Sequence, residues 1–436
     1  VSGAASVNMA ALGSKAEIRG ATIDNGSAGT QVTVQAINSA QLASAAGSAA
    51  LSLAKGGSGG DLGGAVAYST VSDATSASIS DSVLKNAPQV VVHALDGSEQ
   101  TGIGVGAAVN TGGGNSLTLA GSVSVARSNN TTTATIANST LDGGAASAAG
   151  ADARVLDITA YDHSRIGVGA GALSVAAGGN NTGVALGLTY ADISNSSSAV
   201  LSGRGGASGA YDIDHYGAFN LRALDASLIG AGVLTGKISA SKSGVGLSGA
   251  FIWNQVGNSS TASIDGGARV NIAGNATIDA ASVTAADAGV SALDDAIGHA
   301  GSLSGYDFSG NALTYSGTAQ DASQDTTGQP AEAALQASGW GSSIIAVAGD
   351  VAIGGNNVGL SFVGSQVRNT HRIDLGDATL NVGNTLSTTA RDNTRIIDLA
   401  VGLGVSTGQF AGMGSVTYND ISNTDAVRFG SAVAPG

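Results

Sequence analysis

The sequence repeats itself at regular intervals along its length, and this self-similarity constrains the fold more than any other feature. One frame consists of an aromatic residue, an aliphatic residue three positions on and another aliphatic residue eleven positions on, as from Tyr190 to Leu201. The same frame is anchored at Tyr68, Trp253 and Tyr418, and weaker copies begin at Val125 and Gly364.

The sequence numbers of successive anchors differ by 57, 65, 63, 111 and 54. The chain therefore holds about six copies of a 54–65 residue unit. The 111-residue step is either one unit with an insertion or two units of which one is degraded. Periods of this length indicate repeat architectures in which each copy packs on its neighbours.

Within each unit the hydrophobic pattern has a period of two, which predicts β-strands. In the segment 154–160, Leu156 and Ile158 face one way whereas Asp157 and Thr159 face the other. Counterparts of this strand lie at 32–36, 90–94, 276–280 and 386–390.

A polar stretch follows these strands, for example 161–164, and it is interpreted as a corner of the chain. Next come runs in which Gly or Ala alternates with aliphatic residues, such as 166–175. Gly-Gly-Asn-Asn sequences at 178–181 and 354–357 then predict turns.

Gly makes up 68 of 436 residues and aromatic residues only 4%, so the side chains are too small for an ordinary sandwich core. They suit a parallel β-helix, in which coils stack about 4.8 Å apart and small residues fill a narrow interior. A 54–65 residue unit is expected to form two or three coils. The chain is then an all-β solenoid, a rod on the order of 70–100 Å long along its stacking axis.

One region, 285–343, departs from the repeat and separates β-helix segments at 1–284 and 344–436. It contains Pro330 followed by Ala, Glu and Leu, which is typical of a helix start. Another short helix is expected over 288–297. We interpret the region as a partly helical excursion that is either a binding loop or a spacer.

Charge and cysteine content exclude several classes of function. The net charge is −14 without any cluster of Lys and Arg, which argues against nucleic acid and anionic membrane as partners. The absence of Cys excludes disulfides and thiolate metal sites. No transmembrane helix is expected, and the start at Val1 lacks a signal sequence, so we expect the middle of a longer protein.

No catalytic, cofactor-binding or metal-binding residues are predicted. The five His residues are too far apart in sequence for a local metal pair, and His163 and His215 are expected in exposed turns. Residues 56–62 resemble one calcium-binding nonapeptide, but a calcium roll needs adjacent copies. The densest acidic group, Asp212 and Asp214, is interpreted as a solvated corner.

Two further patterns receive structural interpretations. Asp294 and Asp295 form the second densest group of acidic residues in the sequence, after Asp212 and Asp214. The alternating glycines at 102–106 and 167–171 lack the lysine and helix of a phosphate loop, and they indicate close approach of neighbouring backbone instead.

The alternating Gly-Val runs, the Gly-Gly-Asn-Asn turns and the strand at 155–160 resemble those of large secreted bacterial exoproteins. The closest likeness is to filamentous-haemagglutinin-type and leukotoxin-type passengers of two-partner (type V) secretion. The resemblance covers nearly the whole chain. It implies a right-handed parallel β-helix at the Gram-negative cell surface that works in adhesion, biofilm formation or virulence, an outer-membrane secretion partner, and no fixed catalytic residues.

We therefore expect a secreted structural or binding segment of an adhesin or exoprotein, without enzymatic activity, whose partner is a host receptor, a glycan or an exopolysaccharide. The alternative is a β-helical polysaccharide-degrading enzyme with Asp212 and Asp214 as candidate carboxylates. A segment of a secreted cytotoxin and a calcium-dependent module are two further candidate functions.

Overall fold

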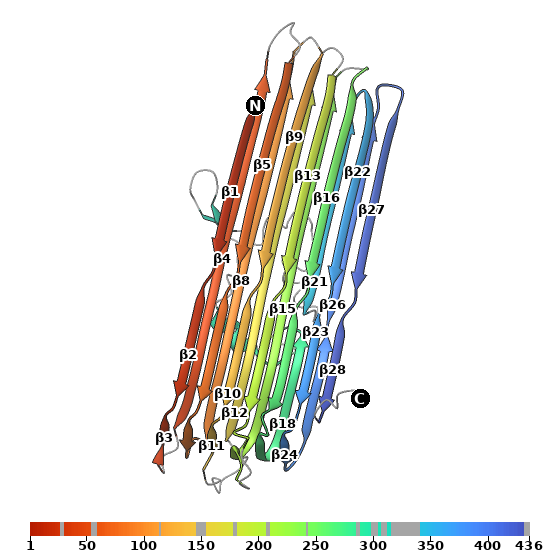
Figure 1. Cartoon of the computed structure of the whole chain (residues 1–436). Coiled ribbons are helices and arrows are strands. Elements are labelled where there is room, and N and C mark those ends of the chain that lie inside the picture. The colour runs from red at the N-terminus through yellow and green to blue at the C-terminus, as the bar shows by residue number, and fades with distance from the viewer. Residues whose placement is uncertain are drawn as a thin grey trace.

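Parallel β-strands make up almost all of the structure, which confirms the all-β class (Figure 1). Three large sheets, A, B and C, contain every described strand except two. The computed structural model describes residues 1–26, 30–53, 59–112, 115–144, 154–177, 181–205, 210–240, 243–284, 288–297, 304–306, 312–314 and 341–430.

Sheets A and B each have seven parallel strands. Sheet A consists of β1 (Ser2–Ala10), β5 (Gly59–Val71), β9 (Ser116–Ser128), β13 (Asn181–Ile193), β16 (Val245–Val256), β22 (Asn356–Val367) and β27 (Ala411–Ile421). Sheet B consists of β2 (Gly13–Arg19), β6 (Ala74–Ser80), β10 (Thr131–Ala137), β14 (Ser196–Ser202), β17 (Ser259–Asp265), β23 (Thr370–Leu375) and β28 (Thr424–Phe429).

Sheet C has 12 strands and includes the longest ones. It consists of β3 (Thr22–Asp24), β4 (Gln31–Ser52), β7 (Val83–Lys85), β8 (Gln89–Asn110), β11 (Thr140–Asp142), β12 (Val155–Ala176), β15 (Ile213–Ser239), β18 (Arg269–Ser282), β21 (Ser342–Ile353), β24 (Thr379–Val382), β25 (Leu386–Asp392) and β26 (Thr394–Val405). The remaining elements are helix α1 (Ser291–Ile297) and the antiparallel pair β19 (Ser304–Tyr306) and β20 (Ala312–Thr314).

Each repeat passes once through sheet C, sheet A and sheet B before it re-enters sheet C, and we call one such passage a rung. Equivalent residues of successive rungs pair in register: Tyr190 lies beside Val125 on one side and beside Trp253 on the other. Trp253 pairs with Gly364, so the 111-residue step is a single rung that contains the excursion. The expectation of two or three coils per unit is therefore wrong, because each unit forms one rung.

The sequence analysis also missed the first copy of the repeat. Val7 on β1 pairs with Tyr68 on β5 and occupies the anchor position of the frame. An aliphatic residue in place of the aromatic one concealed this copy.

The long dimension of the molecule runs along the strands, as Figure 1 shows. Strands β4, β8 and β12 have 22 residues each, which corresponds to roughly 70 Å. Seven strands stacked about 4.8 Å apart span only about 30 Å. The expected rod along the stacking axis is therefore wrong, and the reason is that the polar stretch 161–164 continues β12 instead of forming a corner.

The two largest hydrophobic clusters of the interior lie on either side of the middle of sheet C, and two smaller clusters of Ala lie further along. Leu156 and Ile158 are fully buried, as the alternation predicts, in the larger cluster between sheet B and one half of sheet C. The second largest cluster lies between sheet A and the other half of sheet C, and includes Ile166, Ile193 and Val256.

Glycines let the two layers approach closely at some positions only. A Cβ atom at Gly106 would lie 2.1 Å from the carbonyl oxygen of Gly121 on the facing sheet, and one at Gly104 would lie 2.9 Å from that of Val123. This confirms the interpretation of 102–106. The interpretation is wrong for 167–171, where added Cβ atoms would meet only ordinary contacts of 3.7 Å or more.

The excursion leaves sheet C where β18 ends and returns where β21 begins, opposite the middle of β15. Asp225 of β15 pairs with Ser282, and Ser227, two residues on, pairs with Ser342, so the sheet continues across the break. Helix α1 lies within 288–297, where the sequence predicts a helix, and its Ile297 packs in a cluster on the outward face of sheet C. The helix expected at Pro330 lies outside the described residues.

Gly97 makes room for this helix. A Cβ atom there would lie 2.0 Å from Cγ2 of Ile297.

Within the described ranges, no helix has the length and hydrophobicity needed to span a bilayer.

Replacing Ile158 by Asp should lower the free energy of unfolding by at least about 3 kcal/mol, because the new carboxylate would be buried without a partner. Thermal melting followed by circular dichroism measures this change. Thr33→Asp, on the exposed outward face of β4, is the control and should change stability by less than about 0.5 kcal/mol. Equal melting of Ile158→Asp and the wild type would contradict the inward assignment.

Candidate functional site

A column of five Asn side chains, preceded by Asp73, marks the bend between sheets A and B. The side-chain Oδ1 of each member accepts a hydrogen bond of 2.8–3.2 Å from the backbone N–H of the equivalent residue in the preceding rung. The backbone at the bend is thereby satisfied where regular strand pairing is interrupted. The members of this asparagine ladder are Asp73, Asn130, Asn195, Asn258, Asn369 and Asn423.

The ladder also reaches across the interior to sheet C. Nδ2 of Asn258 donates to Oδ1 of Asp225 at 2.8 Å and to Oγ of Ser227 at 2.7 Å. Asn195 repeats the arrangement one rung earlier, donating to Asp162 at 2.5 Å and to Ser164 at 2.6 Å. We call the asparagine ladder together with these aspartates and serines the polar spine, and it separates the two largest hydrophobic clusters.

The polar spine overturns the corner interpretation of 161–164. Asp162 and Ser164 point into the interior and are fully buried, because they pair with Asn195. His163 lies in the middle of β12, half-buried, and not in an exposed turn.

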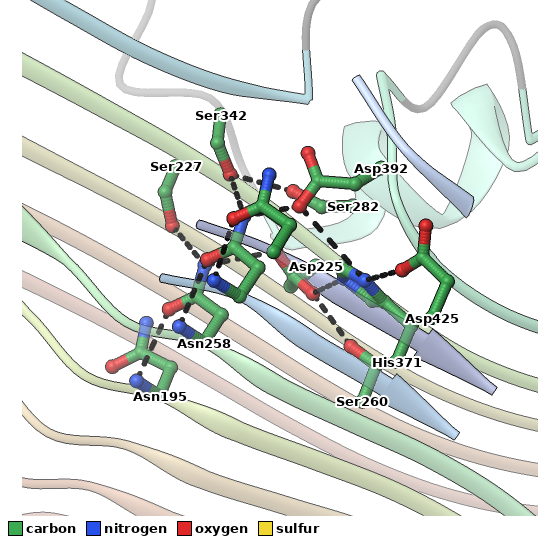
Figure 2. Close-up of polar contacts among 12 residues, drawn as sticks. Asn195, Asp225, Ser227, Asn258, Ser260, Ser282, Ser342, His371, Asp392 and Asp425 are labelled. Atoms are coloured by element: carbon green, nitrogen blue, oxygen red, sulfur yellow. Dashed lines mark hydrogen bonds and ion pairs between the residues drawn. The ribbon is translucent and has the colours of Figure 1, made fainter. Parts of the chain in front are cut away.

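One rung of the spine carries a buried histidine (Figure 2). The side chain of His371, on β23, has no exposed surface. Its Nδ1 lies 2.9 Å from Oδ1 of Asp425 and 3.9 Å from Oδ2 of Asp392, and its Nε2 lies 3.4 Å from Oδ2 of Asp225. Figure 2 shows the imidazole between these carboxylates, with Asn258 and Ser260 also contacting Asp225.

The carboxylates hold this imidazole in its charged form. Burial alone would lower the pKa of His371, but the hydrogen bond and charge of Asp225, with those of Asp425 and Asp392, raise it to about 9. Burial likewise opposes the charge of Asp225, and contact with His371 nevertheless lowers the pKa of that carboxyl group. The two groups form a buried ion pair.

The aspartates of the middle rungs have no such cation. Burial raises the pKa of Asp96 to about 6, against the hydrogen bond from Thr75 and together with the charge of Asp73. Burial and the neighbouring charge of Asp96 raise the pKa of Asp162 well above its usual value. Stacked carboxyl groups thus retain protons at mildly acidic pH.

A second charged cluster lies on the outward face of sheet C. The Asp157 carboxylate contacts His93 Nε2 at 3.2 Å and Arg222 Nη2 at 2.9 Å. Burial opposes this charge, but His93 and Arg222 lower the pKa of Asp157 to about 2. The Asp157 carboxylate therefore has both His93 and Arg222 as partners within this cluster.

The acidic group around 212–215 is divided between separate contacts. Asp212 is buried and accepts a hydrogen bond from Arg204 at 2.7 Å, so the interpretation as a solvated corner is wrong for this residue. His215 is exposed, as predicted, but lies in β15 and not in a turn, and its Nδ1 lies 2.9 Å from Asp142 and 3.6 Å from Asp214. Asp142 is a partner that the sequence did not reveal.

Other candidates lie partly or wholly outside the described residues. Asp61 of the calcium-like segment points inward and is buried, but residues 54–58 are not described. The side chains of Asp294 and Asp295, and all of His299, also fall outside.

Sequence reasoning missed the spine although a signal exists. The position five residues after each anchor from Tyr68 to Tyr418 is Asn or Asp, whereas the first copy, anchored at Val7, has Leu12 there. His371 has no comparable signal, because the equivalent positions hold Thr, Ser or Asp.

Among the residues that the structure describes, no group of three or more His, Asp or Glu side chains is arranged to hold a metal ion. Comparison with protein-family models, with curated proteins and with solved structures gives no match to this chain.

Replacing Asn195 by Asp should destabilise the protein by about 2–4 kcal/mol at pH 7, because a carboxylate would face Asp162 and the Nδ2 donor would be lost. The folded-state pKa of the new group is raised, so the loss should shrink as the pH falls towards the unfolded value of about 3.9. Urea unfolding at several pH values measures this. The exposed Asn384→Asp is the control, and a pH-independent loss would contradict the contact with Asp162.

His371 should stabilise the fold in a defined pH window. Its raised pKa gives a stabilisation that is complete below about 6.5 and is lost as the pH rises through about 9. The lowered pKa of Asp225 contributes a second stabilisation, which is present above about pH 3.8 and is lost in acid.

The free energy of unfolding of the wild type should therefore exceed that of His371→Asn most between about pH 4 and 6.5, by on the order of 2–3 kcal/mol. This difference should narrow above about pH 9. Melting curves of both proteins across this range test the expectation. Thr33→Asn, at an exposed position without a titratable side chain, should show no such gap. A gap that is constant from pH 5 to 10 would refute the buried ion pair.

Proposed function

We propose that this chain is a structural and binding segment of an extracellular bacterial adhesin or exoprotein, folded as a parallel β-helix and without catalytic chemistry of its own. The observation that carries the proposal is the in-register stacking of every repeat on the next, as at Tyr190 and Trp253. Such stacking extends flat outer faces that contact a partner over a wide area.

The placement of the ionisable groups supports a binding role over an enzymatic one. His371 and Asp225 are buried and engaged with each other, and Asp212 is engaged with Arg204. Acid–base catalysis on a sugar needs paired carboxyl groups beside an open groove. The same groups here hold the interior together.

The proposed location is the outside of a Gram-negative cell, reached through an outer-membrane partner. The absence of Cys suits a chain that is exported unfolded, and stacked repeats can fold progressively from one end. The net charge of −14 favours a neutral glycan or a protein receptor over a polyanion.

The test is surface display of the whole chain, through a fused anchor, on a non-adherent Gram-negative strain. Attachment to epithelial cells and to glycan-coated surfaces should rise at least fivefold over the anchor alone. Ile158→Asp, which disrupts the stacking, should remove the gain. No gain in attachment, or cleavage of polysaccharide by the purified chain that is lost in Asp212→Asn, would overturn the proposal.

A further inference from the structure

At one end of the molecule, large apolar side chains face outward and charged side chains face inward. This end, which we call the tip, carries the connections β4–β5, β8–β9, β12–β13, β15–β16, β21–β22 and β26–β27, at the top of Figure 1. Water-soluble sheets place large apolar residues inside and polar residues outside. At the tip most of the large apolar residues face outward on both sheets, and the inward positions hold mainly Ala, Gly, Ser and Thr.

The outward face of sheet C at the tip is entirely uncharged. On β8, from Thr101 to Val109, and on the strands paired with it, the outward positions hold only Gly, Ala, Val, Leu, Ile and one Thr. Leu234 is 66% exposed and Leu403 is 55% exposed. A shallow groove of about 390 Å³ runs over this face beside Leu173 and Leu234.

The outward face of sheet A is also apolar. Leu186 is 48% exposed, and a groove of about 540 Å³ lies beside it, lined by Leu62, Val66 and Phe251. A row of aromatic residues crosses this face at its lower limit, formed by Tyr68, Tyr190, Trp253 and Tyr418.

The charged residues of the tip point inward instead. Lys237 is fully buried, and its Nζ donates to Oδ1 of Asn357 at 3.0 Å. Asp350 is 1% exposed and accepts a hydrogen bond from Thr235 at 3.0 Å. In the described part of the tip, neither outer face presents a Lys, Arg, Asp or Glu side chain.

Charge returns at the same level on both faces. Glu99 and Arg165 follow the apolar rows on sheet C, and Arg127 and Asp192 follow the aromatic row on sheet A. The two levels coincide, because Nε2 of Gln100 donates to the carbonyl oxygen of Arg127 at 2.8 Å. From this level the charge-free strands extend about nine residues, or about 30 Å, to the tip connections.

We propose that the tip docks into lipid, with both of its outer faces in contact with hydrocarbon. Their height of about 30 Å matches the thickness of a bilayer's hydrocarbon core, and aromatic residues beside a charged row are typical of the membrane–water boundary. Inter-strand hydrogen bonds engage the backbone of the inner strands, so hydrocarbon against the two faces meets no unpaired amide group there.

A second copy of the chain fits these observations less well. Each face measures about 30 Å in both directions, which is enough for a dimer, but a dimer covers one face and leaves the other in water. A dimer also does not explain why charged residues begin at the same level on both faces. Lipid surrounds both faces at once.

The proposal names a partner for the attachment role proposed above and extends it. The test uses the whole chain with Trp340 replaced by Phe, so that Trp253 is the only tryptophan. Zwitterionic phosphatidylcholine vesicles are the probe, and flotation on a density gradient measures binding. We expect the protein to float with the vesicles without anionic lipid, and bromine near the lipid carbonyls to quench Trp253 more than bromine at the bilayer centre.

Leu234→Lys and Leu186→Lys should each lower the partition coefficient at least tenfold, with melting temperatures that stay unchanged because both side chains are exposed. Gln89→Lys adds the same charge at the other end of β8 and should leave binding unchanged. Equal binding by all variants, or binding only to anionic vesicles, would overturn the proposal.

Light scattering distinguishes the second copy as the occupant. Dimers that dissociate in Leu234→Lys, without flotation of the wild type, would also overturn the lipid proposal. Cell attachment that persists without vesicle binding would refute this inference and leave the proposed function standing.

Discussion

Every other feature of the structure depends on the backbone hydrogen bonds between equivalent strands of neighbouring rungs. Pairing in register places each residue on its own counterpart, so one favourable contact recurs along the stack. The asparagine ladder is the clearest case, since an amide side chain at the bend accepts the backbone N–H that regular pairing leaves over. A different residue at one rung would leave a buried N–H unsatisfied.

The same stacking sets a limit on charge. Asp96, Asp162 and Asp225 follow one another in the same column, about 4.8 Å apart, and like charges at that distance repel. The chain resolves the conflict in two ways. At mildly acidic pH protons remain on Asp96 and Asp162, whose pKa values are raised, and His371 supplies a cation beside Asp225. The next position of the column holds Ser282.

The sequence was sufficient for the repeat and the strand alternation, because these follow from periodicity alone, but not for the direct pairing of Tyr190 with Trp253, since the repeat length does not say how many coils a unit forms. It was insufficient for the interior of the spine. A polar stretch such as 161–164 looks the same whether it turns in water or pairs inside, and its partner Asn195 lies far away along the chain. Alternation also shows that Ala172 and Leu173 face opposite sides, but not that the larger residue faces outward.

The point in sheet C where the excursion departs and returns has a consequence for how such a chain can diversify. Where the excursion departs and returns, Oγ of Ser282 lies 2.6 Å from Oγ of Ser342, and strand register is preserved on both sides. The scaffold therefore closes independently of what is spliced between these two serines. New segments can be grafted there, between β18 and β21 and opposite the middle of the 27-residue β15, without resetting the architecture around them.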